Sequence, residues 1–209
     1  MRRATLLLTV VILATQAAAV GFGFTVSPRF LFPLHDPFED DGNWERGVMA
    51  GFSFSFDISL IPGFTVGPYF GGLFPTDTYP LEWVEGDGKV FWTDLVVGAR
   101  LKYSIPTGGP LRPWLSVAPG YGILSMTARA EYHGVAYETD YDNTGGFGLD
   151  AGIGVDYRIS EVFFVGFGVD FHINTADKLE LNVEGEIWDF ELEESPVGLG
   201  FGFNAGINL

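Results

Sequence analysis

A set of ionisable residues recurs at alternate positions of otherwise apolar segments, where their side chains would share one face. The basic members are Arg29, Arg100, Lys102 and Arg158, and the acidic members are Asp57, Asp94, Asp150, Asp156 and Asp170, with His172 nearby. Opposite charges on one enclosed face form ion pairs that fill and rigidify an interior. The same residues would alternatively make a charged constriction in a narrow pore. Single-channel conductance separates these two interpretations.

Catalysis would need a nucleophile and a base within reach of each other. The chain has three histidines, namely His35 beside Asp36, His133 in a loop and His172 near the end of an apolar segment. No Gly-x-Ser-x-Gly motif accompanies them. We therefore predict no catalytic residue and no enzyme, and lipid A modification stays as the third alternative for the function.

Carboxylates also gather outside these segments, at residues 39–43 and 140–143. Carboxylate oxygens suit Ca²⁺ or Mg²⁺, but neither stretch matches a twelve-residue calcium-binding loop. We predict no metal site and no cofactor.

The first residues have the three parts of a secretory signal peptide. Met1, Arg2 and Arg3 precede an apolar run at 4–14 and a small-residue segment at 15–19. That run is far shorter than the roughly 20 residues of a transmembrane helix. We expect cleavage after Ala19, with Ala17 as the second choice, so that 1–19 is the signal peptide and 20–209 one mature domain.

Charge and cysteine content exclude several partners. Loss of the signal peptide with its two arginines takes the formal net charge from −16 to about −18. Phosphate binding needs clustered Lys and Arg, so we exclude nucleic acid. The chain has no cysteine, which excludes disulfides and a lipid-modified N-terminal cysteine.

Period-2 alternation predicts eight β-strands and no helix in the mature domain. In 146–159, Phe, Leu, Ile, Val and Tyr share one face, while Gly, Asp and Arg share the other. The predicted strands are residues 20–32, 48–58, 64–74, 94–104, 114–126, 146–159, 163–173 and 197–209. Each has at least the roughly 9 to 11 residues with which a tilted strand crosses a bilayer.

The connections alternate between short and long. Segments 61–63, 106–110 and 160–161 are tight turns, whereas 33–46, 76–90, 127–145 and 175–195 are long. Short periplasmic turns and long external loops are typical of bacterial outer-membrane barrels, and an even strand count puts both termini in the periplasm. The last three long loops carry hairpin signals at 85–88, 133–134 and 184–185. We expect them to extend the sheet beyond the membrane and the first to be irregular.

The bulky apolar face must point outwards, because an eight-stranded lumen is too narrow to hold rows of Phe, Leu and Ile. In lipid the sheet then has to close. We therefore predict an all-β, eight-stranded antiparallel up-and-down transmembrane β-barrel over 20–209. Its lumen would be walled by glycines of the last three strands, and opposite them we expect four rings, those of Tyr69, Trp92, Trp114 and Phe164. We favour packing of these rings on the glycines over a small cavity.

Residues 112–122, Arg-Pro-Trp-Leu-Ser-Val-Ala-Pro-Gly-Tyr-Gly, resemble the fifth strand of the small outer-membrane barrel superfamily that includes OmpX, OmpW, the OmpA barrel and the opacity proteins. The signal peptide, the eight strands and the glycine-rich final strands fit that superfamily across the mature chain. The chain departs from it at its end, where Ile207, Asn208 and Leu209 replace the usual closing aromatic residue.

The resemblance implies a location in the outer membrane of a Gram-negative bacterium and, by analogy, an adhesive role. Our first expectation is contact between the acidic hairpins and host or neighbouring surfaces or surface proteins, with five aromatic candidates, Trp83, Tyr132, Tyr137, Trp188 and Phe190. The alternative is a narrow channel for small solutes or hydrophobic compounds. We expect a monomer whose constant partners are outer-membrane lipid and lipopolysaccharide.

Overall fold

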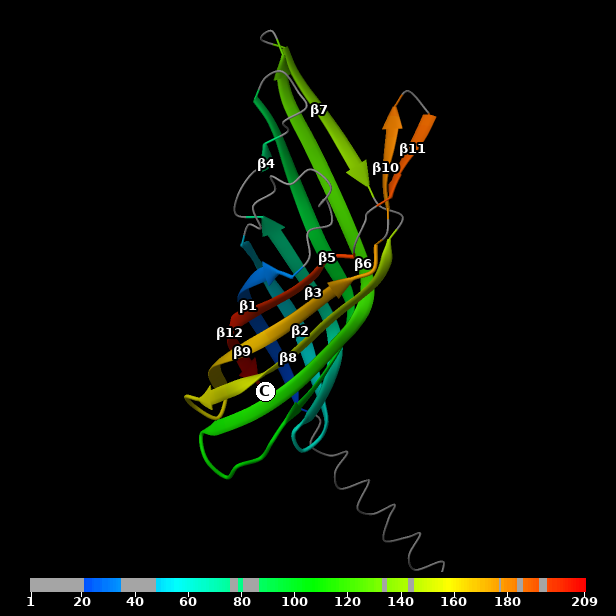
Figure 1. Ribbon diagram of the computed structural model, residues 1–209. Coiled ribbons are helices and arrows are strands. Elements are labelled where there is room, and N and C mark those ends of the chain that lie inside the picture. Colours follow the sequence, from blue (N-terminus) through cyan, green and yellow to red (C-terminus); the bar gives the residue numbers. More distant parts are fainter. Residues whose placement is uncertain are drawn as a thin grey trace, which may run out of the picture.

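The computed structural model is built from β-strands (Figure 1). It describes residues 21–34, 48–75, 79–80, 87–132, 135–142, 145–176, 178–183, 186–191 and 195–209. Within these ranges there is no helix long and apolar enough to span a bilayer.

Eight of the strands close into a barrel. They are β1 (Phe22–Pro33), β2 (Met49–Ile61), β3 (Phe64–Pro75), β5 (Asp87–Ser104), β6 (Leu111–Tyr132), β8 (Gly146–Arg158), β9 (Phe163–Asn174) and β12 (Val197–Asn208). Their spatial order is β6–β8–β9–β12–β1–β2–β3–β5, and β5 pairs with β6 to complete the circle. Every pair is antiparallel. The predicted eight-stranded antiparallel barrel is confirmed.

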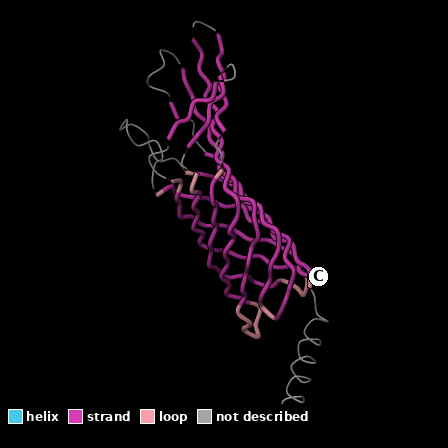
Figure 2. Tube along the Cα trace, turned by 90° about the vertical axis from the view of Figure 1, so that its right-hand side faces the viewer, coloured by secondary structure: helices cyan, strands magenta, loops and turns pink. Residues whose placement is uncertain are grey.

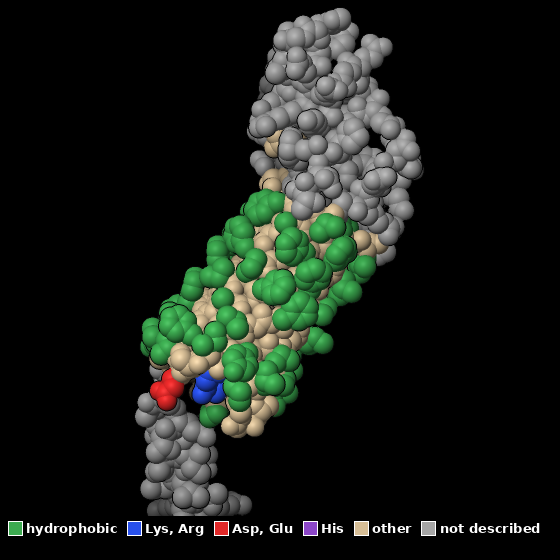
Figure 3. Space-filling view, turned by 90° about the vertical axis from the view of Figure 1, so that its left-hand side faces the viewer, with side chains coloured by type: hydrophobic (Ala, Val, Ile, Leu, Met, Phe, Trp, Pro, Cys, Tyr) green, Lys and Arg blue, Asp and Glu red, His purple; other side chains and the backbone are tan. Residues whose placement is uncertain are grey.

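Side chains alternate between the lumen and the outer wall, because successive residues of a strand point to opposite faces. In β8, Asp150 and Asp156 are buried, whereas Phe147, Ile153 and Val155 are exposed. Figure 3 shows hydrophobic side chains spread over the wall of the barrel, with charged side chains only at one end of this face. The distribution agrees with the predicted assignment of faces.

The short turns gather at one end of the barrel. Gly63, between β2 and β3, has a φ of 83°, and Gly108, between β5 and β6, has a φ of 71°. This left-handed conformation favours glycine, which lacks a Cβ atom. Phe22 and Leu209 join the two ends of the chain through backbone hydrogen bonds of 3.0 and 2.6 Å. The C-terminus lies at this end, opposite the strands that project from the barrel (Figure 2).

At the other end the sheet continues beyond the barrel. Strand β6 leaves β8 after the Gly122–Gly146 pair, and from Ser125 onwards it pairs with β7 (Val135–Asp142). The hairpin of β10 (Lys178–Val183) and β11 (Glu186–Glu191) joins β7, and β4 (Tyr79–Pro80) joins β5. The order β11–β10–β7–β6–β5–β4 defines what we call the projecting sheet (Figures 1 and 2).

The projecting sheet has the two hairpins predicted at 133–134 and 184–185. The predicted strand limits at residues 94 and 126 were wrong, since β5 begins at Asp87 and β6 ends at Tyr132. Both strands run on because they pair with each other and with β4 or β7 outside the barrel. The segments 35–47 and 81–84 lie outside the described residues, which leaves the expected irregular loop and the first hairpin strand as predictions.

Candidate functional site

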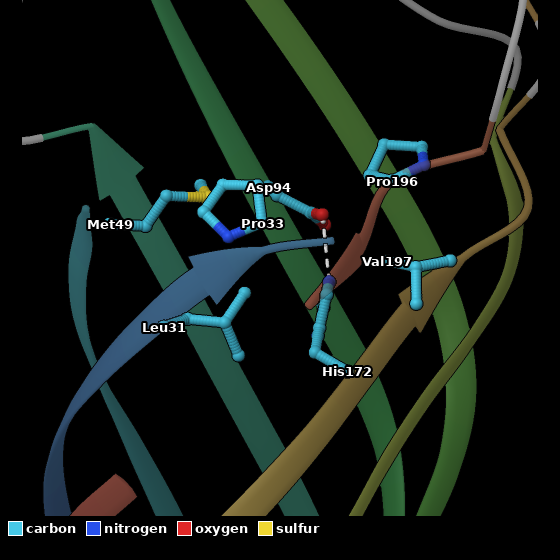
Figure 4. Close-up of a pocket in the computed structure, with 7 residues that line it drawn as sticks. All are labelled: Leu31, Pro33, Met49, Asp94, His172, Pro196 and Val197. Carbon is cyan, nitrogen blue, oxygen red and sulfur yellow. Dashed lines mark hydrogen bonds and ion pairs between the residues drawn. The ribbon is translucent and has the colours of Figure 1, made fainter. Parts of the chain in front are cut away.

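His172 of β9 lies between two carboxylates in the outer half of the lumen. Its Nε2 is 2.7 Å from Asp94 Oδ2 on β5, and its Nδ1 is 2.8 Å from Asp150 Oδ1 on β8. Asn174 Nδ2 donates to the other oxygen of Asp94 at 2.8 Å. Figure 4 shows the His172 ring directed at Asp94. These contacts link strands β5, β8 and β9 across the lumen.

Asp150 extends this network to β1 and β3. Arg29 Nη1 lies 2.8 Å from Asp150 Oδ1, and the Tyr69 hydroxyl donates to Asp150 Oδ2 at 2.6 Å. Arg29 Nη1 also donates to the Tyr69 hydroxyl at 3.3 Å. A Cβ atom at Gly71 would come within 2.7 Å of Arg29 Nη2 and 2.8 Å of Asp150 Oδ2, so glycine leaves room for the pair.

A second ion pair lies nearer the short-turn end. Arg100 Nη2 on β5 is 2.6 Å from Asp57 Oδ2 on β2. The hydroxyls of Thr25 and Ser55 donate to the same carboxylate oxygen, each at 3.1 Å. Charge-assisted hydrogen bonds of this kind are stronger than neutral ones, so the pair ties β1, β2 and β5 together.

A third ion pair joins β5 to β8. Lys102 Nζ is 2.6 Å from Asp156 Oδ2. The ammonium also lies 5.0 Å from the ring centroid of Trp114 and 5.2 Å from that of Phe164, which is cation–π range. The lysine is thereby enclosed by one carboxylate and two aromatic faces.

Two members of the predicted charge set make no ion pair within the described part of the chain. Asp170 stands opposite Gly152 on β8 and Gly200 on β12, so neither neighbouring strand offers it a cation. Arg158 stands opposite Phe164, at the last position of β8. The other predicted members are brought together as three ion pairs and the His172 contacts.

Apolar side chains close the lumen beyond His172. Leu73 and Val96 are 0 % exposed, and Leu31, Met49 and Leu124 are 3 % exposed or less. The cavity beside His172, bordered by Leu31, Met49 and Asp94, has a volume of about 10 Å³ (Figure 4). Buried side chains thus fill the outer half of the barrel, which we call the plug: Leu31, Met49, Leu73, Val96, Leu124 and the His172 network.

Two larger cavities follow towards the short-turn end. The first, of about 30 Å³, is bordered by Arg29, Arg100, Trp114 and Asp170. Some buried nitrogens of Arg29, Arg100 and Trp114 have no hydrogen-bond partner among the described residues. A polar cavity of this size has room for ordered water. The second cavity, of about 180 Å³, lies at the end of the barrel.

The predicted packing of rings on glycines is present for Trp114 and Phe164. A Cβ atom at Gly154 or Gly168 would lie 2.6 Å from the Trp114 ring, and one at Gly206 would overlap Phe164. Tyr69 is buried as expected, while the side chain of Trp92 lies outside the described part. Both rings therefore occupy space that side chains larger than hydrogen would exclude.

The predicted surface candidates fall in or near the projecting sheet. Tyr132 belongs to β6, Tyr137 to β7, and Trp188 and Phe190 to β11, and for these four the backbone alone is described. Trp83 lies outside the described residues. The backbone brings the two β11 residues into one edge strand of the sheet order.

Sequence reasoning missed several partners in the lumen. Asn174, the Tyr69 hydroxyl and the Thr25 hydroxyl all bond to the charge network. The alternation of side chains along a strand could have identified them. Each lies either an even number of residues from a predicted charged residue of the same strand or on the lumen face that glycines line. Arg112 was missed as a charged lumen residue although it is in phase with Trp114.

The charge network encloses His172 and engages both of its ring nitrogens. His172 is 1 % exposed and both its nitrogens are engaged by carboxylates, so a substrate has no access to it. The described residues contain no group of three His, Cys, Asp or Glu side chains that could hold a metal ion. His35 and His133 lie outside the described ranges.

Comparison with protein families identified a matching family model. The model described as an outer membrane protein beta-barrel domain matches residues 4–204. A search of curated protein sequences found no match.

Solved structures share the fold at low sequence identity. A major outer membrane protein from Thermus thermophilus is 11% identical with a TM-score of 0.64, and the alignment covers 91% of this chain and 100% of that one. OprG from Pseudomonas aeruginosa is 15% identical with a TM-score of 0.55, over 91% and 96% of the two chains. Ail from Yersinia pestis, in complex with the heparin analogue sucrose octasulfate, is 11% identical with a TM-score of 0.52, over 91% and 99%.

Proposed function

Because this chain belongs to the outer membrane protein β-barrel domain family, we propose that it is a non-enzymatic surface protein whose projecting sheet contacts other surfaces. The observation that carries the proposal is the projecting sheet itself. A barrel that served only to cross the membrane would need no strands beyond its rim, whereas this chain devotes β4, β7, β10, β11 and the outer parts of β5 and β6 to them.

The composition of the projecting sheet suits contact with a basic partner. Strands β7, β10 and β11 carry seven acidic residues and one basic residue. Complementary charge steers a partner into contact and disfavours acidic competitors. We therefore expect a partner surface rich in Lys or Arg, rather than a polyanion.

The edge of the projecting sheet supports a second mode of contact. Strand β11 stands at one end of the sheet order and pairs with β10 alone among the described strands. An unpaired strand edge can accept an extended segment of another protein through backbone hydrogen bonds. Trp188 and Phe190 belong to this edge strand, where aromatic residues commonly anchor partners.

The plug supports a role other than transport or catalysis. A solute would have to displace fully buried side chains and break the contacts of His172 and Asp150. The only described histidine is enclosed by the same network. We therefore place surface contact ahead of the narrow channel and of lipid A modification.

The remaining parts of the proposal follow from the sequence. Residues 1–19 direct export, and the mature barrel resides as a monomer in the outer membrane of a Gram-negative cell. The exposed apolar wall meets lipid, and lipopolysaccharide surrounds the projecting sheet.

The test compares the full-length protein with a variant whose β10–β11 hairpin, residues 178–191, is replaced by a short Gly-Ser linker. Both proteins, in nanodiscs, are used to capture labelled outer-surface proteins of neighbouring cells. We expect the deletion to abolish capture. Equal capture by the two proteins would contradict the proposal.

A charge-neutral variant separates the two modes of contact. Glu186→Gln, Asp189→Asn and Glu191→Gln remove the charges of β11 and keep its backbone edge. Loss of capture by this variant assigns the contact to charge, and retention assigns it to strand addition. Folding of every variant is checked by the heat-dependent shift in gel mobility of the intact barrel.

A further inference from the structure

The projecting sheet has different residue types on its two faces. Directly opposed residues of antiparallel strands lie on the same face of a sheet, so the register assigns each residue to a face. One row takes one residue from each of β5, β6, β7, β10 and β11, and its members are hydrophobic or aromatic: Trp92, Met126, Tyr141, Leu181 and Trp188. The neighbouring row, on the other face, consists of Thr93, Ser125, Asp142, Glu180 and Asp189. We call them the apolar row and the acidic row.

The two faces of the projecting sheet reverse the polarity of the barrel wall. Leu124 of β6 is buried in the lumen, and Met126, two residues further along, lies on the same face of that strand. The apolar row therefore continues the lumen face, and the acidic row continues the face that meets lipid. Charged residues on a lipid-facing wall are destabilising within the bilayer. The acidic row thus belongs to a part of the sheet that stands in water.

Both rows end on β11, the last strand in the sheet order (Figure 1). β11 pairs with β10 and with no other described strand. Trp188 ends the apolar row and Asp189 ends the acidic row. By alternation, Phe190 shares the face of Trp188, and Glu191 shares the face of Asp189. A strand added to this edge would therefore meet aromatic and acidic positions in turn.

The acidic row has three carboxylates and no cation. Asp142, Glu180 and Asp189 are directly opposed on neighbouring strands, and like charges in such positions destabilise a sheet. Glu191 differs, because it stands opposite Lys178. A Lys or Arg opposite Asp189 would give the row the charge that it lacks. An apolar residue opposite Trp188 would lengthen the apolar row by one strand.

From these two rows we propose that β11 accepts an extended segment in which a Lys or Arg stands between two apolar residues. Backbone hydrogen bonds join the segment to the edge of β11. The cation of the segment stands opposite Asp189, and its two neighbours stand opposite Trp188 and Phe190. This inference rests on the proposed function and names the chemistry of the partner. The pattern of the segment, rather than its net charge, sets the affinity.

The experiment measures, by fluorescence anisotropy, the binding of labelled peptides to the mature protein in phosphatidylcholine nanodiscs, with empty nanodiscs as the blank. An alternating peptide, Val-Thr-Val-Lys-Val-Thr-Val, is compared with a rearranged peptide of the same composition, Val-Val-Thr-Lys-Thr-Val-Val. The charge is the same in both, but only the first places apolar residues beside the lysine. We expect the alternating peptide to bind about fivefold more tightly, the effect of two cross-strand apolar pairs.

Backbone N-methylation tests strand addition. In an extended peptide the N–H groups of successive residues point to opposite edges, so those of the valines face one way and those of the lysine and threonines the other. Methylation of the set that faces β11 should abolish binding. Methylation of the other set should change the affinity by less than about twofold.

Charge reversal locates the contact on β11. The wild-type protein should bind the lysine peptide about tenfold more tightly than the same peptide with Glu in place of Lys. Asp189→Lys should reverse this preference. Glu131→Lys is the matched control, because Glu131 lies on the same face but on β6, which is paired on both sides. This control should leave the preference unchanged.

Four results would overturn the inference. They are no binding at millimolar peptide, equal affinities of the alternating and rearranged peptides, equal effects of the two methylated sets, and an unchanged preference in Asp189→Lys. If one of them occurs while the β10–β11 deletion still abolishes capture, the proposed function stands and only the pattern of its partner is wrong. If the deletion leaves capture unchanged, the proposed function fails whatever the peptides do. Folding of each variant is checked by the heat-dependent gel shift.

Discussion

The two halves of the lumen use the same residue types to opposite effect. In the outer half, both oxygens of Asp94 and Asp150 and both nitrogens of His172 have partners. In the periplasmic half, Asp57 and Asp156 each use one oxygen for an ion pair, and the other oxygen is buried without a hydrogen-bond partner among the described residues. Carboxylates with both oxygens paired lock strands together, whereas a buried carboxylate oxygen without a partner weakens the network that contains it.

The largest expected effect comes from disrupting the charge network in the outer half of the lumen. Asp150→Ala removes the acceptor of Arg29, Tyr69 and His172 at once and leaves a buried guanidinium unpaired. We expect the free energy of unfolding to fall by about 3–5 kcal/mol, measured by urea titration of the barrel in lipid vesicles.

Asp170→Ala is the matched control, because it removes another lumen carboxylate that has no ion pair within the described structure. We expect a change of less than about 1 kcal/mol, since no hydrogen-bonded partner is left behind. Similar losses for Asp150→Ala and Asp170→Ala would show that lumen charge as such, rather than pairing, stabilises the barrel.

A smaller effect is expected from crowding the Trp114 ring, which lies between the two halves of the lumen. A Cβ atom at Gly168 would lie 2.6 Å from the Trp114 ring and 2.9 Å from a backbone oxygen of β8. Gly168→Ala should therefore cost about 1–3 kcal/mol by overpacking. Gly109→Ala, in the turn between β5 and β6, has only Thr107 Oγ1 at 4.0 Å and should be nearly neutral in the same assay.

Breaking a pair in the periplasmic half should cost less than breaking the outer network. Lys102→Met keeps the contact with Trp114 and Phe164 but leaves Asp156 without its cation. The cavity of about 180 Å³ at the short-turn end, which Asp156 lines, can hydrate the stranded carboxylate, so we expect a loss of about 1–2 kcal/mol. A loss as large as that of Asp150→Ala would mean that water reaches a stranded charge no better in the periplasmic half of the lumen than in the outer half.

No ionic current is expected through the wild-type barrel. The cavity at the short-turn end has room for water, but Leu31, Leu73, Val96 and the His172 network block the way to the outer end. Planar-bilayer recordings of purified protein should be silent over the physiological range of voltage. Stable unitary currents would show that the plug opens and would favour the channel alternative.

The alternation of residue types was enough to predict the barrel. Rows of Phe, Ile and Val cannot fit into an eight-stranded lumen, so each strand had one possible orientation and its charged residues had to point inwards. Short and long connections then fixed which end carries the loops. The lengths of β5 and β6 were underestimated because their outer parts pair with β4 and β7, which no local pattern reveals.

Which charges meet was decided by the tertiary structure alone. Arg29 on β1 and Asp150 on β8 are not on neighbouring strands, and they meet across the lumen because of the stagger of the closed sheet. The same stagger leaves Asp170 and Arg158 without ion pairs in the described structure and places Arg112 beside the cavity at the short-turn end. By itself the sequence determined that charge lies inside the barrel. Closure of the sheet decided which of those charges form ion pairs and which have none among the described residues, because only closure sets distances across the lumen.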